Sequence, residues 1–256
     1  VNIDDPYGHL IKLISENRKH KVITVGVHEA ADIKIQDQRF NENGQTLKFS
    51  YLGISRTVDL NLIGAFQATN VLTAAGLAIA LGSATNQVFD ILPKLTNAPG
   101  RMQLVGKKKS SANIYIDYAH TPDALQKALT ALRSHTIGRL VLVFGAGGDR
   151  DKGKRPLMGK IAAKHADEVF VTDDNPRTES PRDIRAEILK ECPTAIEIPD
   201  RAAAILAAVE NIKDGDVLLI SGKGHETFQI VGDDKFPFDD SEYVSMSISL
   251  LEGKKI

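Results

Sequence analysis

The sequence contains one cysteine and no tryptophan among its 256 residues. A single thiol, Cys192, cannot form an internal disulfide or a cysteine-rich zinc site, and it is consistent with a reducing compartment. Long apolar runs are also missing, because none approaches the ~18 residues of a membrane helix. The first ten residues lack the basic and apolar regions of a signal peptide. We therefore expect a cytoplasmic protein with no membrane partner.

Neither sign of charge dominates the chain. It has 32 Lys and Arg against 33 Asp and Glu, a formal net charge of -1. The broad positive field of a nucleic-acid binder is absent, so we expect no nucleic-acid partner. Hydrophobic residues make up 42% of the chain, enough for the core of one large domain or two ordinary ones.

Two sequence textures meet near residues 97–100, where Pro and Gly interrupt both helix and strand. Upstream, apolar and polar residues alternate over 47–51 and 58–62, which is typical of half-buried antiparallel strands. Asn43-Gly44 predicts a tight hairpin turn with positive φ angles. Residues 68–81 are apolar on most faces and predict a buried helix that ends near Gly82.

Downstream, short continuous apolar runs alternate with helical segments, the pattern of parallel strands covered on both faces. Thr121-Pro122 and Ser180-Pro181 predict helix starts, with a hydroxyl at the N-cap and proline at the first helical position. Right-handed crossovers then give an α/β fold with a doubly wound, mostly parallel sheet. The predicted strands are 114–116, 140–144, 169–171 and 217–220, followed by a hairpin at 232–235 and a helix from Ser241.

Ligands bind beyond the carboxyl ends of the strands in such sheets, so the loops that follow the strands are the candidate site. Loop 145–155 combines glycines with alternating charges and suits an anionic or zwitterionic ligand. A surface turn with compensating charges is an equal alternative. It is not a dinucleotide fingerprint, because Arg150 stands where the third glycine would fall. The other candidate loops are 117–123, 172–177 and 221–226.

Two of these loops have a second interpretation. Arg177 offers a planar fork suited to a carboxylate, but the same four residues could be a helix-entry loop with a solvated arginine. Residues 222–226 could be an anion-binding nest beside a carboxylate, or a glycine-rich exit from a strand. The residues alone leave both alternatives open.

Three other features predict no chemistry. His120 and His225 lack metal-ligand spacing, so we expect hydrogen-bonded loop histidines and no metal site. Nothing around Cys192 would activate it as a catalytic thiol. Lys107 to Lys109 is most simply a solvated loop.

Five motifs in the same order and spacing resemble the Mur ligases, ATP-dependent amide-forming enzymes of peptidoglycan synthesis, and in particular the diaminopimelate-adding branch. The resemblance covers essentially the whole chain. The motifs are NAPGRMQ at 97–103, DYAHTPDAL at 117–125, GGDRDKGKRPLMG at 147–159, DDNPRTE at 173–179 and GKGHE at 222–226.

This resemblance implies that residues 1–98 are the C-terminal part of a central ATP-binding domain and that 99–256 are a C-terminal, amino-acid-binding α/β domain. It implies a ligase that adds meso-2,6-diaminopimelate to UDP-N-acetylmuramoyl-L-alanyl-D-glutamate (the UDP-MurNAc-dipeptide) through an acyl phosphate, with ATP and Mg2+, as a monomer. The phosphate loop, carbamylated lysine, magnesium ligands and uridine site of the family are expected upstream of Val1. We therefore expect this polypeptide to be inactive alone, with its catalytic residues outside it.

The resemblance also implies roles for particular residues. Diaminopimelate has a second carboxylate that lysine lacks, which a guanidinium can bind bidentately. Gln67 departs from the family, which commonly has Asn there. The alternatives are an amino-acid-binding module without turnover and a related ligase that adds lysine or polymerises glutamate, which Arg177 disfavours. The implied diaminopimelate contacts are Arg150, Asp174, Asn175, Pro176, Arg177, Gly222 and Glu226, and the implied ATP contacts are Asn70, Arg101, Asp117 and His120.

Overall fold

The chain packs as two compact units, residues 1–96 and 97–256, in a computed structural model that describes residues 1–109 and 112–253. Each unit has a hydrophobic core of its own. The assignment of functional domains at 98/99 stays a prediction. Ser110 and Ser111, which follow the predicted basic loop, lie outside the described residues.

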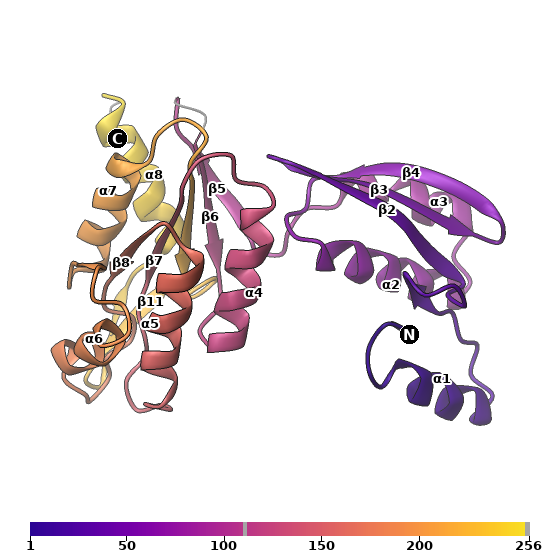
Figure 1. The fold of residues 1–256 in the computed structure, drawn as a ribbon, viewed down its shortest axis with the longest axis horizontal. Coiled ribbons are helices and arrows are strands. Elements are labelled where there is room, and N and C mark those ends of the chain that lie inside the picture. Colours follow the sequence, from indigo (N-terminus) through magenta and orange to yellow (C-terminus); the bar gives the residue numbers. More distant parts are fainter. Residues whose placement is uncertain (110–111, 254–256) are drawn as a thin grey trace. The chain divides into compact units, whose positions relative to one another are not determined.

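Unit 1 is a four-stranded sheet with helices, and its strand order is β1-β2-β3-β4 (Figure 1). β1 pairs in parallel with β2, and the other pairs are antiparallel. The strands are β1 (Val25–Gly26), β2 (Ile33–Asn41), β3 (Gly44–Tyr51) and β4 (Ile54–Leu60), and the helices are α1 (Gly8–Asn17), α2 (Phe66–Ala80), α3 (Thr85–Asp90) and the 3-10 turn η1 (Leu92–Lys94).

The alternation in β3 has the predicted consequence. Leu47 and Phe49 are fully buried, and they share a core with Leu72 of α2. α2 begins two residues before the predicted helix, and Gly82 follows its end with φ +104°. The predicted buried helix packs one face into the core, whereas Leu77 on the other face is 60% exposed, so the helix is less buried than its apolar sequence predicts.

The hairpin between β2 and β3 is present, but its turn differs from the prediction. Asn41 pairs with Gly44, so the two loop residues are Glu42 and Asn43. Asn43 has no positive φ, and Gly44 belongs to the strand with an extended φ of +158°. Glycine is needed there for space, because a Cβ would lie 2.0 Å from the carbonyl oxygen of Leu60.

Unit 2 has a six-stranded sheet in the order β5-β6-β10-β7-β8-β9. Every neighbouring pair is parallel except β5 with β6, which confirms the mostly parallel α/β fold. A separate hairpin pairs β11 with β12. The strands are β5 (Gln103–Lys107), β6 (Asn113–Asp117), β7 (Leu140–Phe144), β8 (Glu168–Val171), β9 (Ile196–Glu197), β10 (Val217–Ser221), β11 (Phe228–Val231) and β12 (Asp234–Pro237).

The crossovers place helices on both faces of this sheet (Figure 1). The chain moves in one direction from β6 to β9, then returns to insert β10 between β6 and β7. Right-handed crossovers in opposite directions put their helices on opposite faces. Accordingly α4, α5 and α6 contact one another in sequence, and α7 contacts α8. The helices are α4 (Pro122–Arg133), α5 (Lys154–His165), α6 (Pro181–Leu189), α7 (Arg201–Asn211) and α8 (Asp240–Leu251).

Both predicted helix starts are confirmed. The Thr121 hydroxyl accepts a hydrogen bond from the N–H of Ala124, and the Ser180 hydroxyl accepts one from the N–H of Asp183. The late hairpin and the final helix are also present. Among residues 1–109 and 112–253, no helix combines the length and the apolar character that a membrane span needs.

The basic run is not a simple solvated loop. Lys107 ends β5, and Lys108 donates from Nζ to the carbonyl oxygens of Val209 (2.8 Å) and Ile212 (3.0 Å) at the end of α7. The last carbonyls of a helix lack intrahelical donors, and a lysine can satisfy them. The prediction of a solvated loop is wrong, because the sequence around these lysines does not show that the end of α7 packs beside them.

Candidate functional site

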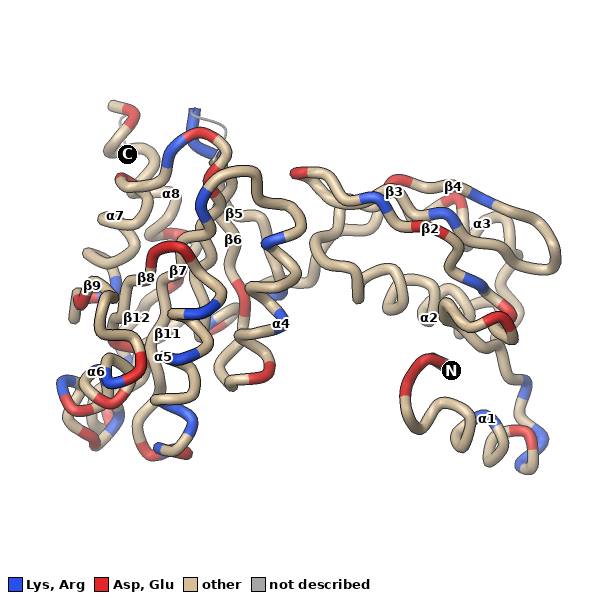
Figure 2. Tube along the Cα trace, in the orientation of Figure 1, with Lys and Arg blue, Asp and Glu red and all other residues tan. Residues whose placement is uncertain are grey.

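Four parallel strands of unit 2 end at the same level. Ser221 of β10 is in register with Asp117 of β6 and with Phe144 of β7, and Phe144 is in register with Val171 of β8. The loops that follow these strands therefore emerge at one edge of the sheet. Figure 2 shows acidic and basic residues interleaved at this lower end of unit 2, near α5 and α6. This edge carries the predicted loops.

The loops after β7 and β8 are packed backbone against backbone. Gly148 donates from its N–H to the carbonyl oxygen of Asn175 at 2.9 Å. A Cβ on Gly148 would lie 1.8 Å from the Pro176 oxygen, and one on Gly145 would lie 2.3 Å from the Thr172 oxygen. The glycines thus permit close approach of a neighbouring loop, which fixes loop 145–155 against the Asp174–Arg177 segment.

The charges of loop 145–155 are mostly paired within the protein, as expected if this loop is a surface turn with compensating charges. Glu179 accepts hydrogen bonds from the buried Arg155 (2.9 and 3.0 Å) and from the N–H of Asp149 (2.6 Å), and it pairs with Lys152 at 3.1 Å. These contacts, Arg155 first, lower the pKa of Glu179 to about 2. The Asp149 carboxylate in turn accepts from the hydroxyl of Thr178 at 2.8 Å.

Arg150 is the exception in that loop. It is exposed, and among the described residues its guanidinium donates only to the carbonyl oxygen of Asp149, at 3.0 Å. Within the described residues no carboxylate forms an ion pair with it. The loop therefore presents one guanidinium that can bind an anion from solution.

Asp174 and Asn175 are buried beside the loop after β10. A Cβ on Gly222 would lie 2.7 Å from Asp174 Oδ2, so this glycine gives the carboxylate its space. Asn175 donates from Nδ2 to Glu226 Oε2 at 2.9 Å, and its Oδ1 accepts from Lys223 Nζ at 2.8 Å. The structure thus brings together the carboxylates and the amide that the sequence singled out. Lys223, buried at their centre, was missed.

Arg177 has a left-handed backbone, with φ +51°. Its N–H donates to the oxygen of Ile230 at 3.1 Å, and its own oxygen accepts from the N–H of Gly232 at 2.8 Å, which holds this conformation. Its Nη1 donates to the oxygen of Gly148 at 2.8 Å and, less closely, to that of Asn175 at 3.4 Å. Nε and Nη2 have no partner among the described residues, so half of the fork remains available.

Three proposed nucleotide contacts gather around Tyr118. The guanidinium carbon of Arg101 lies 4.8 Å from the centre of the tyrosine ring, and the His120 ring lies 4.6 Å from it. The Asp117 carboxylate accepts from the N–H groups of Met102 and Ala119, both at 2.8 Å. Burial raises the pKa of Asp117, although these two hydrogen bonds oppose the shift. Both Asp117 oxygens therefore hold the protein's own loop.

Lys154 connects loop 145–155, which follows β7, to His120, one of the proposed nucleotide contacts. Its Nζ donates to the carbonyl oxygen of His120 at 2.8 Å. Partial burial lowers the pKa of Lys154, while the charges of Asp174 and Asp151 oppose that shift. Neither Lys154 nor Tyr118 stands at a position whose spacing indicates a ligand, so the sequence alone did not single them out.

Asn70 lies in unit 1, apart in the chain from the other candidates. It is exposed on α2 and donates from Nδ2 to Gln67 Oε1 at 3.2 Å. Gln67, the position that departs from the family motif, is thus a direct neighbour of Asn70. The amide group of Asn70 is open to solvent for a ligand of unit 1.

The described residues contain no group of three or more His, Cys, Asp or Glu that could hold a metal ion. His120 and His225 instead both lie against the Tyr118 ring, His225 at 5.3 Å. Cys192 is buried, and burial raises the pKa of its thiol, so it does not present a reactive thiolate.

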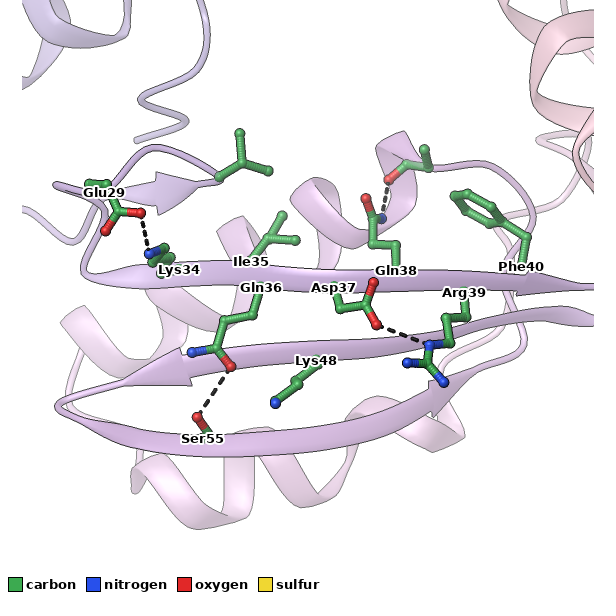
Figure 3. A pocket seen from close by; sticks show the side chains of 12 residues that line it. Glu29, Lys34, Ile35, Gln36, Asp37, Gln38, Arg39, Phe40, Lys48 and Ser55 are labelled. Atoms are coloured by element: carbon green, nitrogen blue, oxygen red, sulfur yellow. Dashed lines mark hydrogen bonds and ion pairs between the residues drawn. The ribbon is translucent and has the colours of Figure 1, made fainter.

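A cavity of about 870 Å³ lies in unit 1, over β2, and contains none of the predicted site residues (Figure 3). Its basic side chains are partly neutralised, because Lys34 pairs with Glu29 at 2.6 Å and Arg39 pairs with Asp37 at 3.0 Å. The residues predicted from the sequence therefore lie outside this cavity, most of them near the strand ends of unit 2 and Asn70 on α2 of unit 1.

Comparison with known proteins matches both units. Residues 1–78 match the Mur ligase middle domain, and residues 100–224 match the glutamate ligase domain of Mur ligases. The chain is 51% identical over 232 residues to the UDP-N-acetylmuramoyl-L-alanyl-D-glutamate--2,6-diaminopimelate ligase of Caulobacter vibrioides, covering 91% of this chain and 47% of that protein.

Solved structures agree with these matches. A structure of a UDP-N-acetylmuramoyl-L-alanyl-D-glutamate--2,6-diaminopimelate ligase is 36% identical with a TM-score of 0.74, over 98% of this chain and 53% of that one. The MurF ligase from Thermotoga maritima in complex with ADP has a TM-score of 0.68 at 22% identity, over 98% and 53%, and shows the fold alone. The chain spans about half the length of the relatives it matches.

Proposed function

The chain belongs to the Mur ligase family, and we propose that it is part of an ATP-dependent ligase that adds meso-2,6-diaminopimelate to UDP-N-acetylmuramoyl-L-alanyl-D-glutamate in peptidoglycan synthesis. Residues 1–98 would then belong to the central ATP-binding domain, and residues 99–256 would form the amino-acid-binding domain. One observation carries the proposal. Near the strand ends of unit 2, Arg177 keeps its Nε and Nη2 donors without a partner among the described residues, close to a group of polar residues: Asp174, Asn175, Gly222 and Glu226.

The proposed reaction has two steps. The carboxylate of the UDP-MurNAc-dipeptide first attacks the γ-phosphate of ATP, which forms an acyl phosphate and releases ADP. The amino group of diaminopimelate then attacks the acyl carbon, displaces inorganic phosphate and loses a proton to give the amide. Phosphorylation supplies the leaving group, so the protein must mainly align the two reactants and neutralise charge. In this chain Asn70, Arg101, Asp117 and His120 are the proposed ATP contacts.

Recognition of diaminopimelate follows from the charges at the strand ends. Asp174 and Glu226 can accept hydrogen bonds from an ammonium group, with Asn175, Pro176 and Gly222 shaping the site between them. Arg177 and Arg150 can donate to carboxylates, and a guanidinium does so in two parallel hydrogen bonds. Lysine has one carboxylate fewer and would leave a guanidinium unpaired, which disfavours it.

We assign no Mg2+ ligand among the described residues of this chain. No cluster of three potential ligands is present there, and both oxygens of Asp117 accept backbone N–H groups. The expected magnesium ligands upstream of Val1 stay a prediction. A cytoplasmic location, supported by a single free thiol, and a monomeric state are likewise proposals.

The variant Arg177→Ala tests the proposal in the 256-residue chain. We expect the loss of a charge-assisted hydrogen bond pair to weaken meso-diaminopimelate binding by at least about tenfold and to change L-lysine binding far less. Titration followed by NMR chemical shifts measures both affinities. Arg182→Ala, on the exposed side of α6, is the matched control and leaves both unchanged. An unchanged ratio of the two affinities in Arg177→Ala would remove Arg177 as the reader of the second carboxylate.

A further inference from the structure

We propose that Lys223 and Gln229 are positioning residues of the amino-acid site, which hold Asn175, Glu226 and the backbone of Arg177 in the arrangement that reads the ligand. Neither residue is among the proposed substrate contacts. The inference rests on the proposed function and extends it to residues that act through others. Gln229 also lies beyond residues 100–224, the part of unit 2 that matches the glutamate ligase domain.

The Lys223 side chain is completely buried. Its Nζ donates to Asn175 Oδ1 and to the carbonyl oxygen of Phe228, both at 2.8 Å, and it lies 3.9 Å from Glu226 Oε2. A buried ammonium is costly unless polar and charged groups compensate it. The burial lowers the pKa of Lys223, while the charges of Asp174 and Glu226 oppose the shift. The chain buries the Lys223 ammonium beside the proposed site despite this desolvation cost, which supports a role for Lys223 in positioning the residues of that site.

The contacts of Asn175 fix the direction of its amide. Its Oδ1 accepts from Lys223 Nζ and, at 3.0 Å, from the N–H of Ile230. Rotating the amide by half a turn would place Nδ2 against two donors, so only one orientation is satisfied. In that orientation Nδ2 donates to Glu226 Oε2 at 2.9 Å. Lys223 thus acts on Glu226 through Asn175.

Glu226 is the end of this chain of hydrogen bonds. Its Oε2 is held by Asn175, whereas its Oε1 has no partner among the described residues. Because Oε2 is held in place, Oε1 of the same carboxylate has a fixed position from which it can accept a hydrogen bond from an ammonium group. Lys223 therefore determines where the ligand's ammonium can bind, without contacting it.

Gln229 holds the same segment from the other side. It lies on β11, and its Nε2 donates to the carbonyl oxygen of Asp174 at 2.6 Å. The neighbouring Ile230 accepts from the N–H of Arg177 at 3.1 Å, and Gly232 donates to the Arg177 oxygen at 2.8 Å. A left-handed arginine is unfavourable and persists only when its surroundings impose it. The β11–β12 hairpin is what imposes it here.

Lys223→Met tests the first residue in the 256-residue chain, with the exposed Lys213→Met as the matched control. Methionine keeps the length and apolar stem but removes the donors. We expect meso-diaminopimelate affinity to fall at least about tenfold in Lys223→Met, and the control to match the wild type. We also expect the Asn175 side-chain amide protons, slow to exchange in the wild type, to exchange faster in Lys223→Met, with or without ligand.

Gln229→Glu tests the second residue and serves if Lys223→Met does not fold. The carboxylate is isosteric with the amide but cannot donate, so it repels the Asp174 carbonyl oxygen. We expect diaminopimelate binding to weaken by at least about fivefold and the preference over L-lysine to shrink. Gln126→Glu, exposed on α4, is the control.

The outcomes separate this inference from the proposed function. If the folded wild type does not bind diaminopimelate, the proposed function fails, and the exchange of the Asn175 amide still tests the positioning. If the wild type binds, and folded Lys223→Met or Gln229→Glu binds equally well with an unchanged Asn175 amide, the positioning role is overturned while the proposed function stands.

Discussion

At the scale of single residues, Glu179 joins the loops that form the proposed site. It accepts from the guanidinium of Arg155 and from the N–H of Asp149, and its side chain is 17% exposed. These donors stabilise the ionised form, which is why the pKa lies at about 2. A carboxylate that folding keeps ionised makes stability depend on pH.

The sign of that dependence follows from the pKa shift. Glu179 has a pKa of about 2 in the folded chain against 4.5 for an unperturbed glutamate. Its contribution is therefore fully present above pH 4.5 and is lost as the pH falls toward about 2. Glu179→Gln should lower the free energy of unfolding at neutral pH and flatten its decline on acidification. Urea unfolding at a series of acidic pH values measures this.

Glu210→Gln, exposed on α7, is the control for that series and should follow the wild type. An acid limb in Glu179→Gln as steep as in the wild type would show that other carboxylates carry the pH dependence.

The sequence predicted the location of the candidate residues in the fold better than the contacts that these residues make. Asp174, Asn175 and Glu226 follow predicted strands, so their shared location at the strand ends could be derived from topology. Lys223 and Tyr118 could not be singled out, because their roles depend on contacts with residues of other loops. Whether Arg177 is solvated or held was also open, and its contact with Gly148 required the structure.

At the scale of elements, the buried strands of unit 2 and the capped helices were predictable. A continuous apolar run and a hydroxyl before proline are local signals, and the structure confirms the strands and both caps. The short strands β1 and β9 have two residues each, too few for a pattern. β5 lies at the edge of the sheet and has no fully buried residue, so it lacks the continuous apolar run of the inner strands. These elements exist because of their pairing partners.

Lys108 shows what an element-scale contact contributes. Its ammonium satisfies carbonyl oxygens at the end of α7, where the helix dipole also favours a cation. Lys108→Met should lower the free energy of unfolding by about 1–2 kcal/mol. Lys107→Met, exposed at the end of β5, should cost much less. Urea unfolding followed by far-UV circular dichroism compares them, and equal values for the two variants would show that Lys108 does not cap the helix.

At the scale of the whole molecule, the two sequence textures correspond to two compact units. The change of texture at 97–100 coincides with the division at Thr96/Asn97. Every proposed diaminopimelate contact belongs to residues 97–256, whereas Asn70, a proposed ATP contact, belongs to unit 1. The near-zero net charge gives the chain no strong overall electrostatic field. It is consistent with a zwitterionic ligand that is recognised by local charged groups.

We propose that unit 2 binds the charged groups at both ends of diaminopimelate. Titration of the 256-residue chain with meso-diaminopimelate and, separately, with L-lysine tests it most directly. We predict saturable binding of diaminopimelate that is at least about tenfold tighter than that of L-lysine, because Arg177 and Arg150 can pair an additional carboxylate. Equal affinity for the two amino acids, or binding of neither by the folded chain, would contradict the claim.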